Sequence, residues 1–482
     1  EMPEYILALD EGTTGVMALL LNPAGEVVQR AYSEFPQYFP KEGWVEHDAE
    51  EIYQTTLKVL KEAVVGISAN SIKAMGITNQ RETTVLWEKK SGKPIAKAIV
   101  WQCRRTKEIC EKLKSHTELF RKKTGLVLDA YFSGTKIKWL LDQNPKYRDQ
   151  ARRGEILFGT IDTWLLWKLT GGKSHKTDFT NASRTLIYNI YEKKWDEELL
   201  QILDIPKQML PEVQNSASDF GRCTEFLPGL LVGGIAGDQQ AALFGQSCHA
   251  PGMAKNTYGT GCFLLMNVGS KAVTSNKGLL TTLACDEQGK PIYALEGAVF
   301  IAGAGVQWLR DQLQIIKNAS ETEALASQVS NTGGVYFVPA FVGLGAPYWD
   351  MGARGAILGM TRGTGRNHLV RAVLEAIAYQ TKEVVDLMSK ESGIPIRDLR
   401  VDGGACANNF LMQFQADLLQ IAVDRPTMIE STALGAGLLA GVYTGTMKQY
   451  QRVSERKFYP QISRESEYQG WKLAVKRILT SA

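Results

Sequence analysis

The 482-residue chain lacks several features that would place it in common protein classes. No apolar run approaches the roughly 18 residues of a membrane-spanning helix, and no signal-peptide pattern opens the sequence. The seven cysteines form no C-x-x-C pair, and the five histidines have no metal-ligand spacing. These absences disfavour a disulfide framework and a zinc site. We therefore expect a cytoplasmic protein with reduced thiols and no membrane insertion.

The net charge and the lack of two common phosphate-binding motifs exclude further classes of protein. The formal net charge of +4 is small for this length, so no nucleic-acid partner is expected. Arg104-Arg105 lies in a charge-mixed segment that predicts a solvated helix face. A Walker-type loop at Gly172-Lys173-Ser174 would need glycine where Trp167 stands. Gly435-Ala436-Gly437 mimics a dinucleotide fingerprint, but it lies in an apolar helical pattern where small residues favour close packing.

Length and periodicity predict two α/β domains. The chain exceeds what one hydrophobic core usually holds, and its composition of 44% hydrophobic and 22% charged residues is ordinary for a globular protein. Strand-like hairpins and amphipathic helical segments alternate in both halves. The pattern breaks at residues 247–252, Ser-Cys-His-Ala-Pro-Gly, which predicts a boundary there.

A polar hexapeptide follows the β-branched run at residues 72–78. It reads Asn79-Gln80-Arg81-Glu82-Thr83-Thr84 and combines a fully ionised fork donor, a carboxylate and two amides. Because a hydroxyl both donates and accepts, a polyol site needs such donors beside acceptors. Taken alone, the hexapeptide also fits a polar surface turn.

Three glycine-bearing turns have the composition of nucleotide-phosphate sites. Asp10-Glu11-Gly12-Thr13-Thr14-Gly15 and Tyr258-Gly259-Thr260-Gly261 each join two apolar strands, about 250 residues apart. Asp402-Gly403-Gly404-Ala405 follows a strand and opens a helical pattern with Phe410, Phe414, Leu418 and Ile421 on one face. The repeated Gly-Thr turn predicts two related halves with a nucleotide between them.

Gly237-Asp238-Gln239-Gln240 stands between the two hairpins in the chain and opens an apolar-periodic segment. Asp238 fits two roles at this strand-to-helix turn. It can cap the helix N-terminus, or it can accept a proton from an attacking hydroxyl or hold a metal ion.

Taken together, these motifs resemble the FGGY family of carbohydrate kinases over nearly the whole chain. The matching stretches start at Asp10, Gly43, Asn79, Trp101, Asp129, Asn181, Gly237, Tyr258, Gly345 and Val401. The runs Arg81 to Thr84, Trp101 to Thr106 and Asp129 to Tyr131 are most similar to members that act on glycerol. The resemblance implies two ribonuclease-H-like domains of the actin and hexokinase superfamily, residues 1–248 and 249–482, that close on a cleft. It also implies phosphoryl transfer from ATP to glycerol, with Mg²⁺ as cofactor.

The resemblance implies a role for each matching side chain. Asp238 would be the general base, and glycerol would contact Arg81, Glu82, Trp101, Tyr131, Asp238, Gln239 and Phe263. Asp10 and Asp238 would support Mg²⁺. The nucleotide would contact Thr13, Thr14, Gly15, Thr260, Gly303, Gln307, Gly404 and Asn408.

One departure from the family and two alternatives stay open. After Thr13-Thr14 the family usually carries Arg or Lys within a few residues, whereas this chain has Gly15-Val16-Met17, which puts its phosphate affinity in doubt. A kinase for another small polyol or ketose would share most of these motifs. An actin-like nucleotide switch would share the turns but has no use for Arg81, Glu82 and Tyr131. Homo-oligomer formation is also left open.

Overall fold

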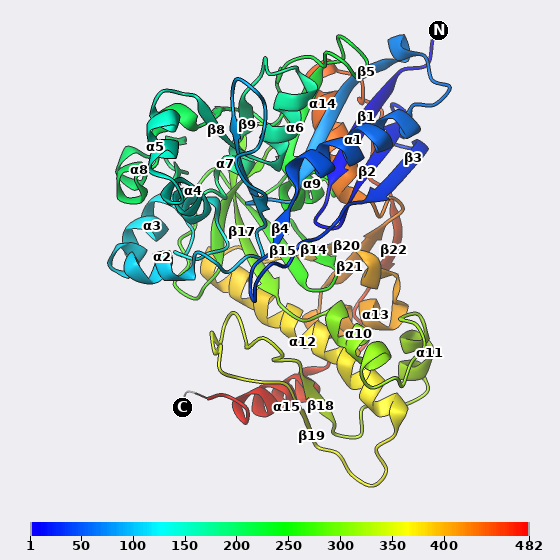
Figure 1. Ribbon diagram of the computed structural model, residues 1–482. Helices are drawn as coiled ribbons and strands as arrows, with labels where there is room; N and C mark the ends of the chain where they lie inside the picture. The colour runs from blue at the N-terminus through cyan, green and yellow to red at the C-terminus, as the bar shows by residue number, and fades with distance from the viewer. Residues whose placement is uncertain (1, 481–482) are drawn as a thin grey trace.

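The computed structural model describes residues 2–480, which form two α/β halves (Figure 1). The first half is built on a five-stranded sheet in the order β13-β5-β1-β2-β3. Strands β1, β5 and β13 run parallel, and β2 and β3 continue the sheet as an antiparallel meander. The strands are β1 Tyr5–Glu11, β2 Gly15–Leu21, β3 Val27–Glu34, β5 Ile72–Asn79 and β13 Val232–Gly237.

The second half repeats this arrangement in a seven-stranded sheet ordered β16-β17-β15-β14-β20-β21-β22. Strands β14, β20 and β21 run parallel, while β15 and β17 form the antiparallel meander. The strands are β14 Ala254–Tyr258, β15 Cys262–Gly269, β16 Leu280–Cys285, β17 Pro291–Val299, β20 Asp398–Asp402, β21 Ala422–Pro426 and β22 Ser454–Phe458.

The two sheets therefore share one topology, with β1 and β2 matched by β14 and β15. The predicted Gly-Thr turns are confirmed as the two hairpin turns, at residues 12–14 and 259–261. An antiparallel meander beside parallel strands, repeated once, confirms the predicted two-domain fold class.

Helices and small sheets complete each half. The first half has α1 Ala49–Ala63, α2 Lys107–Lys112, α3 Thr117–Thr124, α4 Ser133–Asp142, α5 Pro145–Arg152, α6 Ile161–Leu169, α7 Phe179–Ala182, α8 Glu197–Leu203 and α9 Asp238–Gly245. Its smaller strands are β4 Glu46–His47, β6 Thr84–Glu88, β7 Ala98–Ile99, β8 Ile156–Thr160, β9 Lys176–Asp178, β10 Tyr188–Asn189, β11 Lys194–Trp195 and β12 Glu212–Gln214. The second half has α10 Gly303–Asp311, α11 Glu321–Ser327, α12 Arg366–Ser392, α13 Asn409–Leu419, α14 Ser431–Thr444 and α15 Glu465–Lys476, with strands β18 Tyr336–Val338 and β19 Ala356–Leu358.

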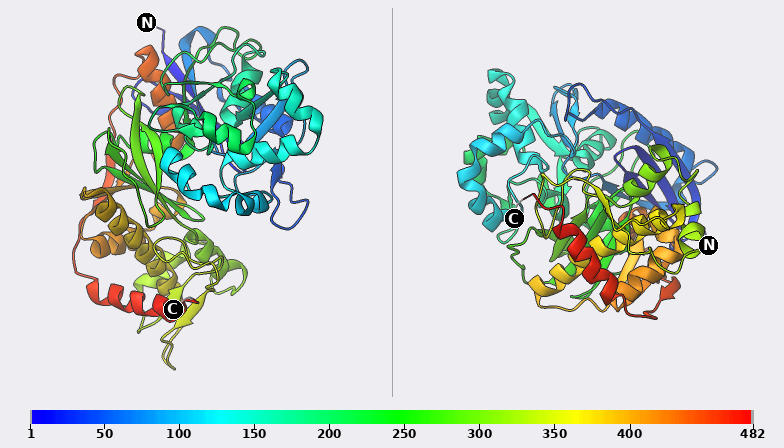
Figure 2. Two further views of the ribbon diagram at one scale, coloured as in Figure 1. Left: turned by 90° about the vertical axis from the view of Figure 1, so that its left-hand side faces the viewer. Right: turned by 90° about the horizontal axis from the view of Figure 1, so that it is seen from below.

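Helix α14 joins the two halves. Although it comes late in the chain, it packs on α9 and on β1, β5 and β13 of the first sheet, and its orange ribbon lies among the blue strands (Figures 1 and 2). The close packing predicted for its small residues is confirmed, because a Cβ at Gly435 would collide with the carbonyl of Ala241. A Cβ at Gly76 of β5 would collide with Ala436 in the same way. The two halves are therefore contiguous in sequence but interleaved in space.

Two local predictions were wrong. The helix after Asp402 begins only at Asn409, because a short 3-10 turn over Gly404–Ala407 intervenes, and Ile421 lies beyond its end. Arg105 is not solvated: its guanidinium is buried and stacks between Trp44 and Trp139 at 3.8 Å and 4.8 Å from their ring centroids. A charged residue can cover aromatic faces in this way because guanidinium is weakly hydrated.

Between residues 2 and 480, no helix combines the length and the apolar character needed to cross a bilayer.

Candidate active site

The hexapeptide Asn79 to Thr84, which the sequence predicts to bind a polyol, forms a strained, buried turn at the end of β5. The backbone N–H of Thr83 donates to the carbonyl of Arg81 at 2.7 Å, and Glu82 between them has a φ of 65°. A non-glycine residue in this region is costly, on the order of 1–3 kcal/mol. Packing holds it there because Arg81, Glu82 and Thr83 are all buried. The surface-turn alternative is therefore wrong.

Arg81 is surrounded by acceptors. Its Nη1 lies 2.7 Å from Glu296 Oε1, and its Nε lies 3.2 Å from Asp238 Oδ1. Its Nη2 is 3.5 Å from the Tyr131 hydroxyl, too far for a strong hydrogen bond. Nη2 therefore has donor capacity left for a ligand.

Glu82 offers the matching acceptor. Its Oε1 accepts from Arg184 Nε at 2.8 Å, whereas its Oε2 accepts no hydrogen bond from residues 2–480. The two residues thus hold an unspent donor on Arg81 Nη2 and an unspent acceptor on Glu82 Oε2, and Arg81 Nε lies 3.7 Å from Glu82 Oε1. This pairing is what a hydroxyl group, donor and acceptor at once, requires.

Two residues without a predicted role complete the charge pattern. Arg184 and Glu296 are buried, and Arg184 Nη2 lies 2.8 Å from Glu296 Oε2. Arg81, Glu82, Arg184 and Glu296, called here the charge quartet, alternate in sign, with Glu296 reaching in from β17 of the second half. Burial raises the pKa of Glu296, but Arg184 and Arg81 outweigh it and leave the pKa below its ordinary value.

The signals for these two residues were weak. Arg184 lies in a stretch that resembles the family, Asn181 to Thr185, but its spacing points to no particular chemistry. Glu296 is a single carboxylate in the otherwise apolar end of β17. Such a residue is almost never fully buried without a partner, so its position alone could have flagged an ion pair.

Aromatic rings border the quartet. Trp101 and Tyr131 contact edge to face, with ring centroids 5.8 Å apart, and Trp101 Nε1 donates to Thr13 Oγ1 at 3.0 Å. Trp101 is half-buried: its backbone N–H donates to Thr83 Oγ1 at 3.2 Å, and its ring also packs against the neighbouring hydrophobic core. Phe263 is half-buried near the start of β15, and no ring contact between it and Trp101 or Tyr131 occurs among the described residues.

Asp238 stands at the first position of α9, directly after β13. Gly237, not Asp238, occupies the N-cap, and the Asp238 carboxylate accepts the N–H of Gln239 at 2.8 Å and faces Arg81 Nε at 3.2 Å. The capping role is therefore not realised. Its side chain is 31% exposed and so is accessible to a ligand. Burial raises the pKa of Asp238, with Arg81 opposing the shift, which makes the carboxylate a better proton acceptor.

Asp10 lies near the end of β1, opposite Met17 of β2. Burial, then the charges of Asp238 and Glu430, raise the pKa of Asp10 to about 7. Between residues 2 and 480 no group of three or more His, Cys, Asp or Glu side chains forms a metal cage. Carboxylate and hydroxyl oxygens nevertheless suit Mg²⁺, which takes one or two carboxylates and keeps several waters. A cation beside Asp10 would relieve the repulsion that raises its pKa.

The first hairpin is shaped by its glycines. Gly12 N–H donates to the carbonyl of Gly15 at 2.9 Å, and a Cβ at Gly15 would lie 2.5 Å from the Tyr32 hydroxyl. Thr13 is half-buried and Thr14 is exposed. The turn therefore presents hydroxyls and backbone, while Gly15 packs against β3.

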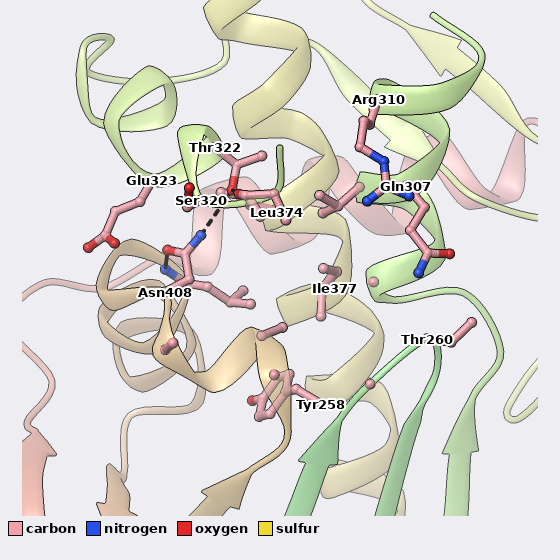
Figure 3. Close-up of a pocket in the computed structure, with 18 residues that line it drawn as sticks. Tyr258, Thr260, Gln307, Arg310, Ser320, Thr322, Glu323, Leu374, Ile377 and Asn408 are labelled. Carbon is pink, nitrogen blue, oxygen red and sulfur yellow. Dashed lines mark hydrogen bonds between the residues drawn. The ribbon is translucent and has the colours of Figure 1, made fainter. Parts of the chain in front are cut away.

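A cavity of about 460 Å³ lies in the second half (Figure 3). It brings together five of the predicted nucleotide residues: Thr260, Gly303, Gln307, Gly404 and Asn408. Gln307 and Arg310 of α10 line one side, and Asn408, Thr322 and Glu323 line the other (Figure 3). The first-hairpin residues Thr13, Thr14 and Gly15 do not line this cavity.

The cavity wall is fixed by backbone contacts. Gly303 N–H donates to the carbonyl of Gly259 at 2.9 Å, and a Cβ at Gly303 would lie 2.6 Å from that oxygen. Asn408 caps α13 by accepting from Leu411 N–H and donates to Thr322 Oγ1 at 3.2 Å. Sequence reasoning missed Arg310, Thr322 and Glu323, since they belong to no motif.

A duplicated α/β fold with a buried, charged turn and a cavity of about 460 Å³ is typical of sugar and polyol kinases. The model of the N-terminal domain of the FGGY family of carbohydrate kinases matches residues 5–245, and the C-terminal domain model matches residues 254–444. The chain belongs to this family.

Individual relatives show which members of the family the chain resembles. The chain is 56% identical to "Glycerol kinase 2" of Thermotoga maritima and 56% identical to "Glycerol kinase" of Alkaliphilus metalliredigens, each over 99% of both chains. Among solved structures it is similar to Plasmodium falciparum glycerol kinase with ADP, with a TM-score of 0.91 and 37% identity over 100% of this chain and 99% of that one. A xylulose kinase from Lactobacillus acidophilus, 21% identical over 98% of this chain and 97% of that one, shares the fold with a TM-score of 0.87.

Proposed function

We propose that this protein transfers the γ-phosphoryl group of ATP to a terminal hydroxyl of glycerol, giving glycerol 3-phosphate and ADP. One observation supports glycerol as the substrate. In a buried turn, Arg81 Nη2 has donor capacity left and Glu82 Oε2 has acceptor capacity left, and a hydroxyl group needs both. The names of full-length relatives at 56% identity support the same reaction. The structure of a relative with ADP supports ATP as the phosphoryl donor.

Asp238 is the proposed general base. It lies 3.2 Å from Arg81 Nε, so a hydroxyl held by Arg81 and Glu82 would be beside its carboxylate. The glycerol O–H bond breaks toward Asp238 while oxygen bonds to the γ-phosphorus, and ADP leaves from the opposite side. Tyr131, Gln239, Trp101 and Phe263 would complete the polyol site. Correct positioning and charge neutralisation provide most of the rate in such transfers.

The nucleotide would span the two hairpins. Thr13, Thr14, Gly15 and Thr260 would face its phosphates, and Gly303, Gln307, Gly404 and Asn408 would border the nucleoside. Mg²⁺, when bound near Asp10 and Asp238, would neutralise phosphate charge. On this proposal residues 1–248 supply the polyol site and first hairpin, and residues 249–482 supply the second hairpin and the nucleoside cavity.

We also propose a cytoplasmic location. All seven cysteines are free, as reduced thiols require.

A coupled assay of ADP release tests the reaction. Release should depend on an alcohol, should saturate with glycerol and should yield glycerol 3-phosphate. Faster turnover with another polyol or a ketose would make that compound, rather than glycerol, the proposed substrate. ADP release without any alcohol would favour a nucleotide switch.

A further inference from the structure

A buried lysine lies between the polyol side and the nucleotide side of the protein. Lys255 is on β14, and its side chain has no exposed surface. Its ammonium donates to Gln239 Oε1, to Thr257 Oγ1 at 2.9 Å and to the carbonyl of Phe263 at 3.2 Å. No carboxylate among the described residues forms an ion pair with it. A buried lysine without such a partner is rare.

The three contacts suit the ammonium form of Lys255. A carbonyl oxygen accepts hydrogen bonds only, and Thr257 already spends its hydroxyl proton on Asp402 Oδ1, 2.5 Å away. With the Gln239 amide oxygen as the third acceptor, an ammonium group satisfies all three contacts. Burial lowers the pKa of Lys255, and the nearby charges of Asp402, Glu296 and Asp238 oppose that shift.

This geometry orients the amide of Gln239. Because an ammonium group can only donate, it must face the amide oxygen, and the amide nitrogen points the other way. That nitrogen donates to no residue between 2 and 480, and Gln239 directly follows Asp238. Gln239 thus keeps two unspent N–H donors at the residue that follows the proposed base in the chain.

From Lys255 the hydrogen bonds continue through Thr257 to Asp402, at the turn that borders the nucleoside cavity. Asp402, which accepts from Thr257, also accepts from Gln246 Nε2 at 2.9 Å and directly precedes Gly403-Gly404. Gly403 is at a φ of 85°, and a Cβ there would collide with the backbone of Tyr258. Strand β14 therefore contacts the turn at Asp402-Gly403 through Thr257 and Tyr258, two and three residues after Lys255.

We propose that Lys255 is a positioning residue for glycerol, which locks the Gln239 amide so that its N–H donors face the polyol. The inference deepens the proposed function and rests on it. Lys255 itself touches no substrate in this scheme. A lysine that only ties strands together would act on stability and on both substrates alike, and this difference makes the proposal testable.

The test measures glycerol affinity by titration calorimetry in wild type, Lys255→Met, Gln239→Leu and the double variant. Lys255→Met should weaken glycerol binding about ten-fold, because the freed amide can turn away from the polyol. In the Gln239→Leu background the same lysine substitution should change affinity less than about two-fold, since residues that act as one unit do not add. ADP affinity should stay within about two-fold of wild type for Lys255→Met.

Thr257→Val is the matched control. It removes one acceptor of Lys255, together with the hydroxyl that donates to Asp402, and leaves the Gln239 contact in place. It should keep glycerol affinity within about two-fold of wild type. Equal losses in Thr257→Val and Lys255→Met would overturn the proposal.

The remaining outcomes are also decisive. The inference is contradicted if the two losses of glycerol affinity add fully in the double variant, or if Lys255→Met loses no glycerol affinity. Either result leaves the proposed function intact. A wild type that binds no glycerol contradicts both. If Lys255→Met does not fold, Gln239→Leu and the double variant still decide the matter, because the double variant places two apolar side chains together. A ten-fold gap between those two variants would overturn the proposal.

Discussion

The polyol turn and the nucleoside cavity are built on opposite principles. The polyol turn is a buried set of alternating charges with a strained backbone at Glu82. The nucleoside cavity, about 460 Å³, is lined by glycine, alanine, short polar and aliphatic residues, with the charged Arg310 and Glu323 on its opposite sides. On the proposed function, fixed charges would bind a small hydroxylated ligand, and the cavity would give a large flat ligand the space and the close backbone approach that it needs. Substitutions on the two sides probe this contrast, from the largest expected effect to the smallest.

Asp238→Asn should give the largest change. It removes the proposed proton acceptor but keeps its size and its hydrogen bond from Gln239 N–H. Loss of a general base costs roughly 10²-fold to 10⁴-fold in turnover. Steady-state assays at saturating glycerol would measure it, with ADP affinity as the control for folding. Retention of more than about a tenth of wild-type turnover would show that Asp238 is not the base.

Glu296→Gln should show that the polyol side depends on charge balance. The two arginines of the quartet would lose one of their two shared carboxylates, and an uncompensated buried charge costs about 3 kcal/mol or more of unfolding free energy. Urea denaturation would measure the loss. Glu455→Gln, at an exposed ion pair with Arg425 of 2.8 Å, is the control and should cost less than about 1 kcal/mol. Equal losses in the two variants would contradict a special role for the quartet.

Arg81→Ala should weaken glycerol and spare the nucleotide. Removing a charged donor from a buried hydroxyl costs about 1.5–3 kcal/mol, or roughly ten-fold to a hundred-fold in affinity. Calorimetric titration with each ligand separates the two effects. An equal loss of ADP affinity would place Arg81 on the phosphate side.

Gly303→Ala should have the reverse effect. The added Cβ would lie 2.6 Å from the Gly259 carbonyl, so the second hairpin and α10 must move apart. Overpacking of this kind costs about 1–3 kcal/mol, and we expect ADP affinity to fall about ten-fold while glycerol affinity is kept. Unchanged ADP binding would show that the cavity wall tolerates the shift.

Met17→Arg should have the smallest effect, a gain in ADP affinity. Met17 is buried directly opposite Asp10, so an arginine there would reach a carboxylate beside the phosphate-facing hairpin. Charge-assisted hydrogen bonds favour tighter ADP binding, by several-fold or about 1 kcal/mol after ordering costs. Titration of the wild type and the variant with ADP would measure the gain, which should depend little on salt because position 17 is buried. A loss of affinity would mean that burying the guanidinium outweighs the contact.

The same contrast explains which features the sequence could predict. Repeated Gly-Thr turns and the polar hexapeptide are local patterns, so the duplicated fold and Arg81, Glu82 and Asp238 could be singled out from the order of residues alone. Glu296 and Lys255 are single charges inside strands of the second half, and their partners are distant in sequence. Their roles follow only from tertiary packing. The placement of α14 on the first sheet was equally invisible, because periodicity reports a helix but not the sheet that it covers.

Steady-state ADP release, measured over a grid of glycerol and ATP concentrations for wild type, Arg81→Ala and Gly303→Ala, tests the account most directly. We predict glycerol-dependent release by the wild type, a glycerol curve shifted at least about ten-fold in Arg81→Ala with an unchanged ATP curve, and the opposite pattern in Gly303→Ala. Release without glycerol, or variants that shift both curves equally, would contradict a charged polyol site separate from a backbone-lined nucleotide site.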